Sequence, residues 1–227
     1  MSEEAKAIQE VAKTTREGLE LTQRICQFLK KVFGNAIEEI GEIAHDWAKW
    51  FRYKNLLLIY DKVEAIHAKR HLEGKTVPIS LRTAIPLIEK ASLEDDELLQ
   101  DMWAGLIANA TDPNKRLDVK KIYIEILSSL EPLDVEVLRF LAKQGWNLHR
   151  IQFVDRTGGI TVAILSEKLN TEEENLYISL QNLARLGCLI DERPQTLGNA
   201  VSGIHVTDPE SIFRPSSLGF SLIKACE

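Results

Sequence analysis

The 227-residue chain has few of the residues that define disulfide-rich, collagen-like or low-complexity proteins. It contains 12 Gly, 7 Pro and 3 Cys. The cysteines, Cys26, Cys188 and Cys226, are scattered and include no CxxC pair. Such an odd set favours neither a disulfide framework nor a cysteine-rich zinc site, and it is typical of a reducing compartment. We therefore expect a globular protein of the cytoplasm.

A long hydrophobic run is also missing. The densest apolar stretch, Leu56 to Tyr60, is far shorter than the roughly 20 residues that a membrane-spanning helix needs, and no signal-peptide pattern opens the sequence. We expect no transmembrane segment. Amphipathic patterns at Glu3–Phe33 and Ile37–Ile66 leave a membrane-perturbing effector as an alternative, but their mixed charge suits a helical bundle better.

Positive charge is not in excess. The chain has 28 Lys and Arg residues against 34 Asp and Glu residues, which gives a formal net charge of −6. Proteins that bind nucleic acid neutralise phosphates with basic side chains. Nucleic acid is therefore a disfavoured partner.

Established catalytic motifs are absent from the sequence. It has no GxxxxGK phosphate loop, GxSxG elbow, HExxH pair or GxGxxG fingerprint. His67 and His71 have the i, i+4 spacing that could place two metal ligands on one helix face, but a solvated helix end explains them more simply. The acidic residues from Glu94 to Asp101 fit the start of a helix, where the dipole favours negative charge. We predict a non-enzymatic protein with no catalytic residue, metal ion or cofactor.

Hydrophobic periodicity predicts a helical bundle in residues 1–130. Apolar residues recur at spacings of three and four in five segments: 3–33, 37–66, 81–87, 98–107 and 119–130. Because Pro86 interrupts the third segment, it is expected to be one kinked helix or two turns joined by a corner. Ser92 precedes Asp95 by three residues, which predicts that Ser92 caps the fourth helix.

Residues 131–227 show a different order of elements. The pattern predicts a helix at 133–144, a strand at 151–154, helices at 161–169 and 171–186, strands at 188–191 and 205–214, and a helix at 216–225. This is the order of a winged helix-turn-helix. The expected fold class is therefore mostly α, with an N-terminal helical bundle at 1–130 followed by a winged helix-turn-helix-like α+β domain at 131–227.

The helix predicted at 171–186 has one apolar and one exposed face. A DNA-reading helix would place its first residues in the major groove, but this one begins with Thr171 followed by three glutamates. Its exposed face contains an isoleucine in the middle, which is more typical of a protein contact, although a lone exposed apolar residue is also common. Four residues on this face are our candidates for interaction: Glu174, Ile178, Gln181 and Arg185.

A series of motifs in the middle of the chain resembles a known family. The motifs are Asp46-x3-Trp50-x-Arg52-x2-Asn55, Ala91-Ser92-Leu93-Glu94-Asp95-Asp96-Glu97-Leu98, Met102-Trp103-Ala104-x-Leu106-x-Ala108-Asn109-Ala110, and Leu130-x-Pro132-Leu133-Asp134. In this order, over about residues 41–144, they resemble the bacterial abortive infection alpha family. The resemblance implies a role in defence against phage and a winged-helix-like C-terminal part, but no reaction.

Four residues match positions of that family: Arg52, Asn55, Trp103 and Asn109. We expect them to be scaffold residues. The leading hypothesis is a cytoplasmic phage-defence protein that acts through contacts with a protein partner, and a homo-oligomer stays open. The alternatives are a winged-helix transcriptional regulator that binds DNA and a membrane-perturbing effector.

Overall fold

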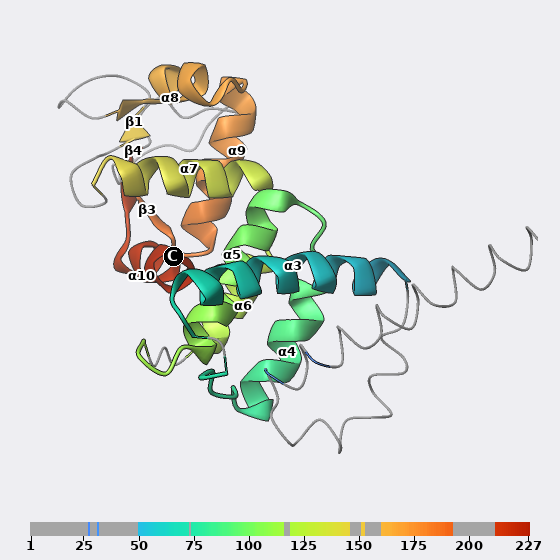
Figure 1. The fold of residues 1–227 in the computed structure, drawn as a ribbon. Coiled ribbons are helices and arrows are strands. Elements are labelled where there is room, and N and C mark those ends of the chain that lie inside the picture. The colour runs from blue at the N-terminus through green and yellow to red at the C-terminus, as the bar shows by residue number, and fades with distance from the viewer. Residues whose placement is uncertain are drawn as a thin grey trace, which may run out of the picture. The chain divides into compact units, whose positions relative to one another are not determined.

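A computed structural model describes residues 50–72, 74–115, 119–145, 151–152, 160–192 and 212–227, together with Gln27 and Lys31. Within these residues the chain is mostly helical (Figure 1). The helix predicted at 3–33 and the first part of the one predicted at 37–66 lie outside the described residues, so the N-terminal bundle as a whole stays a prediction.

The elements of the described part are eight helices and four short strands. The helices are α3 (Trp50–Lys69), α4 (Leu81–Ala91), α5 (Glu97–Thr111), α6 (Lys121–Leu127), α7 (Pro132–Lys143), α8 (Val162–Leu169), α9 (Glu173–Arg185) and α10 (Ser217–Cys226). The strands are β1 (Ile151–Gln152), β2 (Ile160–Thr161), β3 (Leu189–Asp191) and β4 (Ile212–Pro215).

These elements form two compact units. Unit 1 contains the described residues up to Asp95 together with Trp103–Ile124, and unit 2 contains Asp96–Met102 together with the described residues from Glu125 onward. The division therefore passes through α5 and α6. The domain boundary that the sequence suggests between residues 130 and 131 stays a prediction.

Helix α4 in unit 1 runs through a proline. Pro86 lies inside this 11-residue helix, so the segment is one helix and the alternative of two turns joined by a corner is wrong. The expected kink stays a prediction. The helix buries four apolar side chains: Ala84, Leu87, Ile88 and Ala91. Burying each large aliphatic side chain stabilises the fold by about 1.5–3 kcal/mol. Burial of Leu87 and Ile88 therefore contributes about 3–6 kcal/mol, which offsets the roughly 3 kcal/mol that an internal proline costs.

Helix α5 begins later than the sequence pattern suggests. Its first backbone N–H groups, those of Leu98 and Leu99, donate to Oδ1 of Asp96 at 2.9 and 3.1 Å. Asp96 is therefore the capping residue, and the prediction of Ser92 is wrong. Ser92 instead ends α4, where its hydroxyl donates to the carbonyl of Glu89 at 2.7 Å. Both residues can cap a helix, and the position at which α4 stops decides between them.

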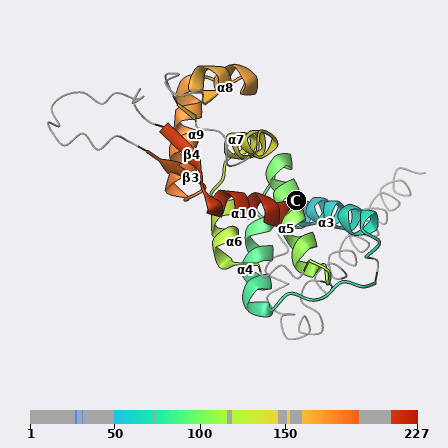
Figure 2. The same cartoon turned by 90° about the vertical axis from the view of Figure 1, so that its left-hand side faces the viewer.

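Unit 2 combines α7 to α10 with a four-stranded sheet in the order β2-β1-β4-β3. Strand β4 pairs antiparallel with both neighbours, and β1 pairs parallel with β2. Figure 2 shows β3 and β4 next to each other beside α9, which packs against α7, α8 and β3. On α9 the buried face is formed by Leu176, Leu180 and Leu183, and Tyr177 meets Phe213 of β4 edge-on with ring centroids 6.4 Å apart.

The corner between α8 and α9 follows the sequence prediction. Asn170 has a φ of 49° in the left-handed region, which asparagine tolerates better than most residues. Helix α8 is capped by Thr161, whose hydroxyl accepts from the N–H of Ile164. Strand β2, which contains Thr161, is not predicted from the sequence because two residues are too few for an alternating pattern.

A glycine closes α9 and leads the chain into β3. Gly187 has a φ of 74°, and a Cβ atom there would lie 3.3 Å from Cδ2 of Leu218. Its carbonyl also accepts a hydrogen bond from Ser216 at 2.5 Å. This position therefore combines a left-handed backbone with close packing against α10, and both favour glycine.

Candidate functional site

A hollow of about 520 Å³ lies beside α9 and the start of α7, within unit 2. It is lined by Ser129, Glu131, Leu133, Asp134, Asn175, Ile178, Ser179, Asn182 and Arg185. Two of the four predicted interaction residues, Ile178 and Arg185, are therefore part of the lining. Volumes of this size are typical of sites that receive a ligand or a side chain of a partner.

Asp134 is a buried carboxylate in the lining of this hollow. Its side chain is buried, with 1% exposure, at the third position of α7. Oδ1 accepts from the hydroxyl of Ser179 at 2.5 Å, and Oδ2 accepts from Nδ2 of Asn182 at 2.7 Å and from the N–H of Glu131 at 2.8 Å. The carboxylate therefore links the start of α7 to two successive turns of α9, and its buried charge is stabilised by three donors.

Asn182 extends this network toward the surface. Its Nδ2 also donates to the carbonyl of Ser129 at 3.1 Å, and its Oδ1 accepts from Nη2 and Nε of Arg185 at 2.7 and 3.2 Å. The amide thus uses both its donor and acceptor groups within the fold. These polar groups hold the helices in place, and Asn182 and Asp134 have little hydrogen-bonding capacity left for a substrate.

The outer surface of α9 carries the predicted interaction residues. Ile178 is 59% exposed, the highest value among the large hydrophobic side chains of the described part. Glu174 and Arg185 are exposed, and neither forms an ion pair with another described residue. Gln181 is half-buried and its amide lies 3.5 Å from Oδ2 of Asp191. The four residues thus lie on one face of the helix, opposite its buried leucines.

The charge of this region is mainly negative. Glu172, Glu173 and Glu174 are exposed at the start of α9, and Glu167 is exposed on α8. On the same two helices the basic residues are Lys168 and Arg185. A phosphate backbone approaching the first turn of α9 would meet carboxylates, which cannot displace the counterions condensed on the nucleic acid.

The four scaffold candidates lie in unit 1. Asn55, Trp103 and Asn109 are at most 2% exposed, whereas Arg52 is half-buried. Nδ2 of Asn55 donates to the carbonyl of Ser92 at 3.3 Å, and thus satisfies a backbone acceptor at the end of α4. Trp103 packs on the apolar stripe of α5.

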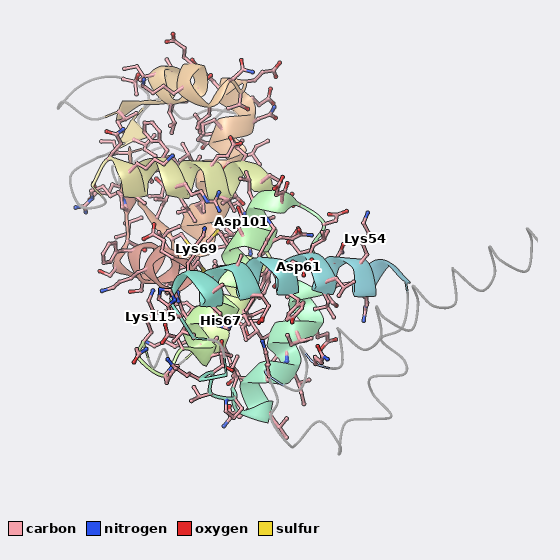
Figure 3. All side chains as sticks on the ribbon, viewed as in Figure 1. Lys54, Asp61, His67, Lys69, Asp101 and Lys115 are labelled. Carbon is pink, nitrogen blue, oxygen red and sulfur yellow. The ribbon has the colours of Figure 1, made fainter. Side chains whose placement is uncertain are left out.

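A buried polar cluster near the end of α3 is missed by the sequence patterns. Figure 3 marks His67 and Lys69 on this part of the helix. Nε2 of His67 lies 3.0 Å from the hydroxyl of Thr111, which itself donates to the carbonyl of Ile107 at 2.8 Å. Because that hydroxyl proton is already used, Thr111 accepts from His67, and the Nε2–H tautomer is assigned. Burial lowers the pKa of His67, so the neutral ring is favoured.

The spacing of His67 and His71 does not create a metal site. Helix α3 ends at Lys69, and His71 has a φ of 56° outside the helix. The two imidazoles therefore do not share a helix face. The preferred expectation of a solvated helix end is wrong for His67, whose side chain is 4% exposed, and it holds for His71, which is exposed beyond the end of the helix. Within the described residues, no group of three or more His, Cys, Asp or Glu side chains could hold a metal ion.

Arg70 completes the cluster from the end of α3. Its Nη1 donates to Oδ1 of Asn109 at 2.7 Å and lies 3.5 Å from Oδ2 of Asp112. Asn109 and Asp112 are buried. These partners are about 40 residues away along the chain, and no local motif signals the contact. Asn109 thus orients the guanidinium of Arg70 beside the carboxylate of Asp112.

Comparison with known families identifies the chain. The profile of the abortive infection alpha family matches residues 53–226, which is most of the sequence. The chain belongs to the abortive infection alpha family. No curated protein and no solved structure matches it.

The match in this abortive infection alpha protein extends beyond the motifs at 41–144 and includes α9 and its surroundings. All four interaction candidates lie within it, as do Asn55, Trp103 and Asn109, whereas Arg52 directly precedes it. Family membership links the protein to abortive infection. Among the helices that the structure describes, none has the length and apolar character required to cross a bilayer.

Proposed function

We propose that this abortive infection alpha protein is a non-enzymatic component of bacterial phage defence. It acts in the cytoplasm and binds another protein through the exposed face of α9. The observation that carries the proposal is the 59% exposure of Ile178 at the rim of a hollow. An apolar side chain beside a concavity is typical of an anchor point for a partner.

The winged-helix interpretation of residues 131–227 is part of the proposal. In it, α8 and α9 form the helix-turn-helix, and β3 and β4 belong to the wing. The acidic first turn of α9 disfavours the alternative of a DNA-binding regulator, because Glu172, Glu173 and Glu174 would face phosphates. The same helix offers a partner protein an apolar centre with charged ends.

The polar groups of the hollow support a structural role and not a catalytic one. Asp134, the buried carboxylate of the site, accepts from Ser179, Asn182 and the N–H of Glu131. A general base needs a lone pair directed at a substrate proton. Here the three donors take up the hydrogen-bonding capacity of the carboxylate. They also hold α7 against α9, the helix that contains Ile178.

Phage protection by chain variants tests the proposal. In a host that depends on this protein for resistance, Ile178→Asp should remove protection, measured as the efficiency of plating of a phage panel. The matched control is Ile164→Asp on α8, because Ile164 is also exposed, at 46%, and does not line the hollow. The control should protect like the unchanged chain. Full protection by Ile178→Asp, with both variants folded by circular dichroism, would contradict the proposal.

A further inference from the structure

The four exposed-face residues of α9 have the spacing of a helix-packing seam. Glu174, Ile178, Gln181 and Arg185 follow one another at intervals of four, three and four residues, as positions d, a, d and a of a heptad do. We call this set the α9 stripe. Its ends are an exposed carboxylate and an exposed guanidinium, and its centre is Ile178.

The α9 stripe has complementary charges when two copies of the helix lie antiparallel. Its four positions are symmetric about a point between residues 179 and 180. In an antiparallel pair of α9 helices, Glu174 of one copy would therefore face Arg185 of the other, and Ile178 would face Gln181. Such an arrangement has a twofold axis, and each contact occurs twice. A parallel pair would instead bring like charges together.

We propose that the α9 stripe binds a second copy of this chain in this antiparallel arrangement. The inference rests on the proposed function, because it names the partner that the α9 face receives. Charge complementarity selects this occupant. Glu174 and Arg185 are about 16 Å apart along their own helix and cannot pair within one copy. Among the described residues neither has an ion pair. Two N–H groups of Arg185 donate to the neutral amide of Asn182, so its charge is not neutralised within one copy.

The hollow provides the apolar part of the contact. Ile178 and the half-buried Leu133 both line it. A second α9 laid over this rim would remove both Ile178 side chains from water and would cover the aliphatic part of Gln181. One large apolar residue and one end-to-end ion pair per copy form a small interface, so the dimer should be weak.

Charge reversal on the full-length chain tests the pairing by sedimentation equilibrium. The unchanged protein should form a dimer that weakens as salt is added. Glu174→Arg and Arg185→Glu should each raise the dissociation constant about tenfold or more, because two like-charge pairs then face each other. An equimolar mixture of the two variants should form a heterodimer, because every pair in it is again of opposite charge. The chain that carries both substitutions should dimerise like the unchanged protein.

Several results would overturn the inference. They are an unchanged protein that stays monomeric up to millimolar concentration, single variants that dimerise like the unchanged protein, and a mixture that forms no heterodimer. Circular dichroism of each variant shows whether it is folded. The doubly substituted chain provides an independent check, since recovery of its dimer requires the two positions to pair between copies.

The outcomes also separate this inference from the proposed function. A monomeric protein whose Ile178→Asp variant still loses phage protection would overturn the dimer and keep the function with a different protein partner. A dimer that both single charge reversals disrupt without any effect on protection would confirm the pairing and contradict the functional role of the α9 face.

Discussion

The hydroxyl of Ser179 lies 2.5 Å from Oδ1 of Asp134 and joins α9 to α7 across 45 residues of sequence. Both side chains are buried, with exposures of 5% and 1%. One turn further along α9, Asn182 donates to the other oxygen of the same carboxylate. The position of the exposed α9 face therefore depends on a buried carboxylate at the start of a different helix.

Substitution of Asp134 should destabilise unit 2 strongly. Asp134→Ala leaves the buried hydroxyl of Ser179 without its acceptor, which costs about 1–3 kcal/mol, and it also removes the hydrogen bonds from the part-buried donors of Asn182 and Glu131, each of which contributes about 1 kcal/mol. We expect the free energy of unfolding to fall by about 3 kcal/mol or more, measured by urea denaturation at neutral pH. Ser179→Ala removes one of the three bonds and should cost about 1–2 kcal/mol.

A double-mutant cycle checks this assignment. If Ser179 acts through Asp134, then Ser179→Ala should cost less than about 0.5 kcal/mol when Asp134 is already alanine. Equal losses for Ser179→Ala in both backgrounds would mean that the two side chains contribute independently. That result would contradict the role of Asp134 as the centre of the network.

Two glycines allow backbone strain to be separated from packing. Gly74 and Gly187 have similar positive φ values of 71° and 74°, but an added Cβ meets nothing within 4 Å at Gly74 and meets Leu218 at 3.3 Å at Gly187. Gly74→Ala should therefore lower the free energy of unfolding by about 1 kcal/mol through strain alone. Gly187→Ala should lower it further, by about 1 kcal/mol more, because the neighbouring side chain must shift. Thermal unfolding of both variants measures the difference, and equal losses would contradict the packing argument.

Elements with local signals could be predicted from the sequence. Pro132 and the acidic residue two positions later mark the start of α7, where Glu131 and Asp134 form a capping box. Asn170 marks the corner between α8 and α9. The exposed face of α9 also follows from periodicity, because its buried leucines define the opposite side. In each case the decisive residues lie within about two helical turns of one another.

Features that depend on distant residues could not be predicted. The capping residue of α5 is wrongly predicted as Ser92, because Ser92 and Asp96 are both good capping residues and only the packing of α4 decides where that helix ends. The hollow depends on Asp134 meeting Ser179, and the cluster of unit 1 depends on Arg70 meeting Asn109. Hydrophobic periodicity carries no information about such polar pairs.

The buried His67 should make stability depend on pH. Burial lowers its pKa below the ordinary value of 6.5, although the backbone of Ala108 and the carboxylate of Glu64 act in the opposite direction. At a pH between the lowered pKa of His67 in the folded chain and its ordinary pKa in the unfolded chain, the unfolded chain binds a proton that the folded chain does not. The free energy of unfolding should therefore fall as the pH drops below about 6.5. Below the folded-state pKa both states bind the proton, so His67 causes no further loss of stability.

The variant His67→Gln isolates this contribution. Glutamine does not titrate, and its amide can still donate to Thr111 as Nε2 of His67 does. Urea denaturation at several pH values between about 7.5 and 5.5 should give a shallower loss of stability for the variant than for the unchanged chain. Two parallel curves would show that His67 titrates alike in the folded and unfolded states.

The thiol of Cys188 should be inert in the folded protein. Cys188, which directly precedes β3, is fully buried, and burial, together with the nearby charge of Asp134, raises its pKa to about 12. At pH 8 its thiolate fraction is then about one in ten thousand, and the thiolate is the species that reacts with alkylating reagents. Iodoacetamide at pH 8 should leave Cys188 unmodified in the native chain and modify it readily in urea, as measured by peptide mass spectrometry. Asp134→Ala, which loosens the contact between α7 and α9, should increase the labelling of the native chain. Equally fast labelling of the native and the urea-unfolded protein would show that Cys188 is open to solvent, and the packing of α9 against β3 would then be wrong.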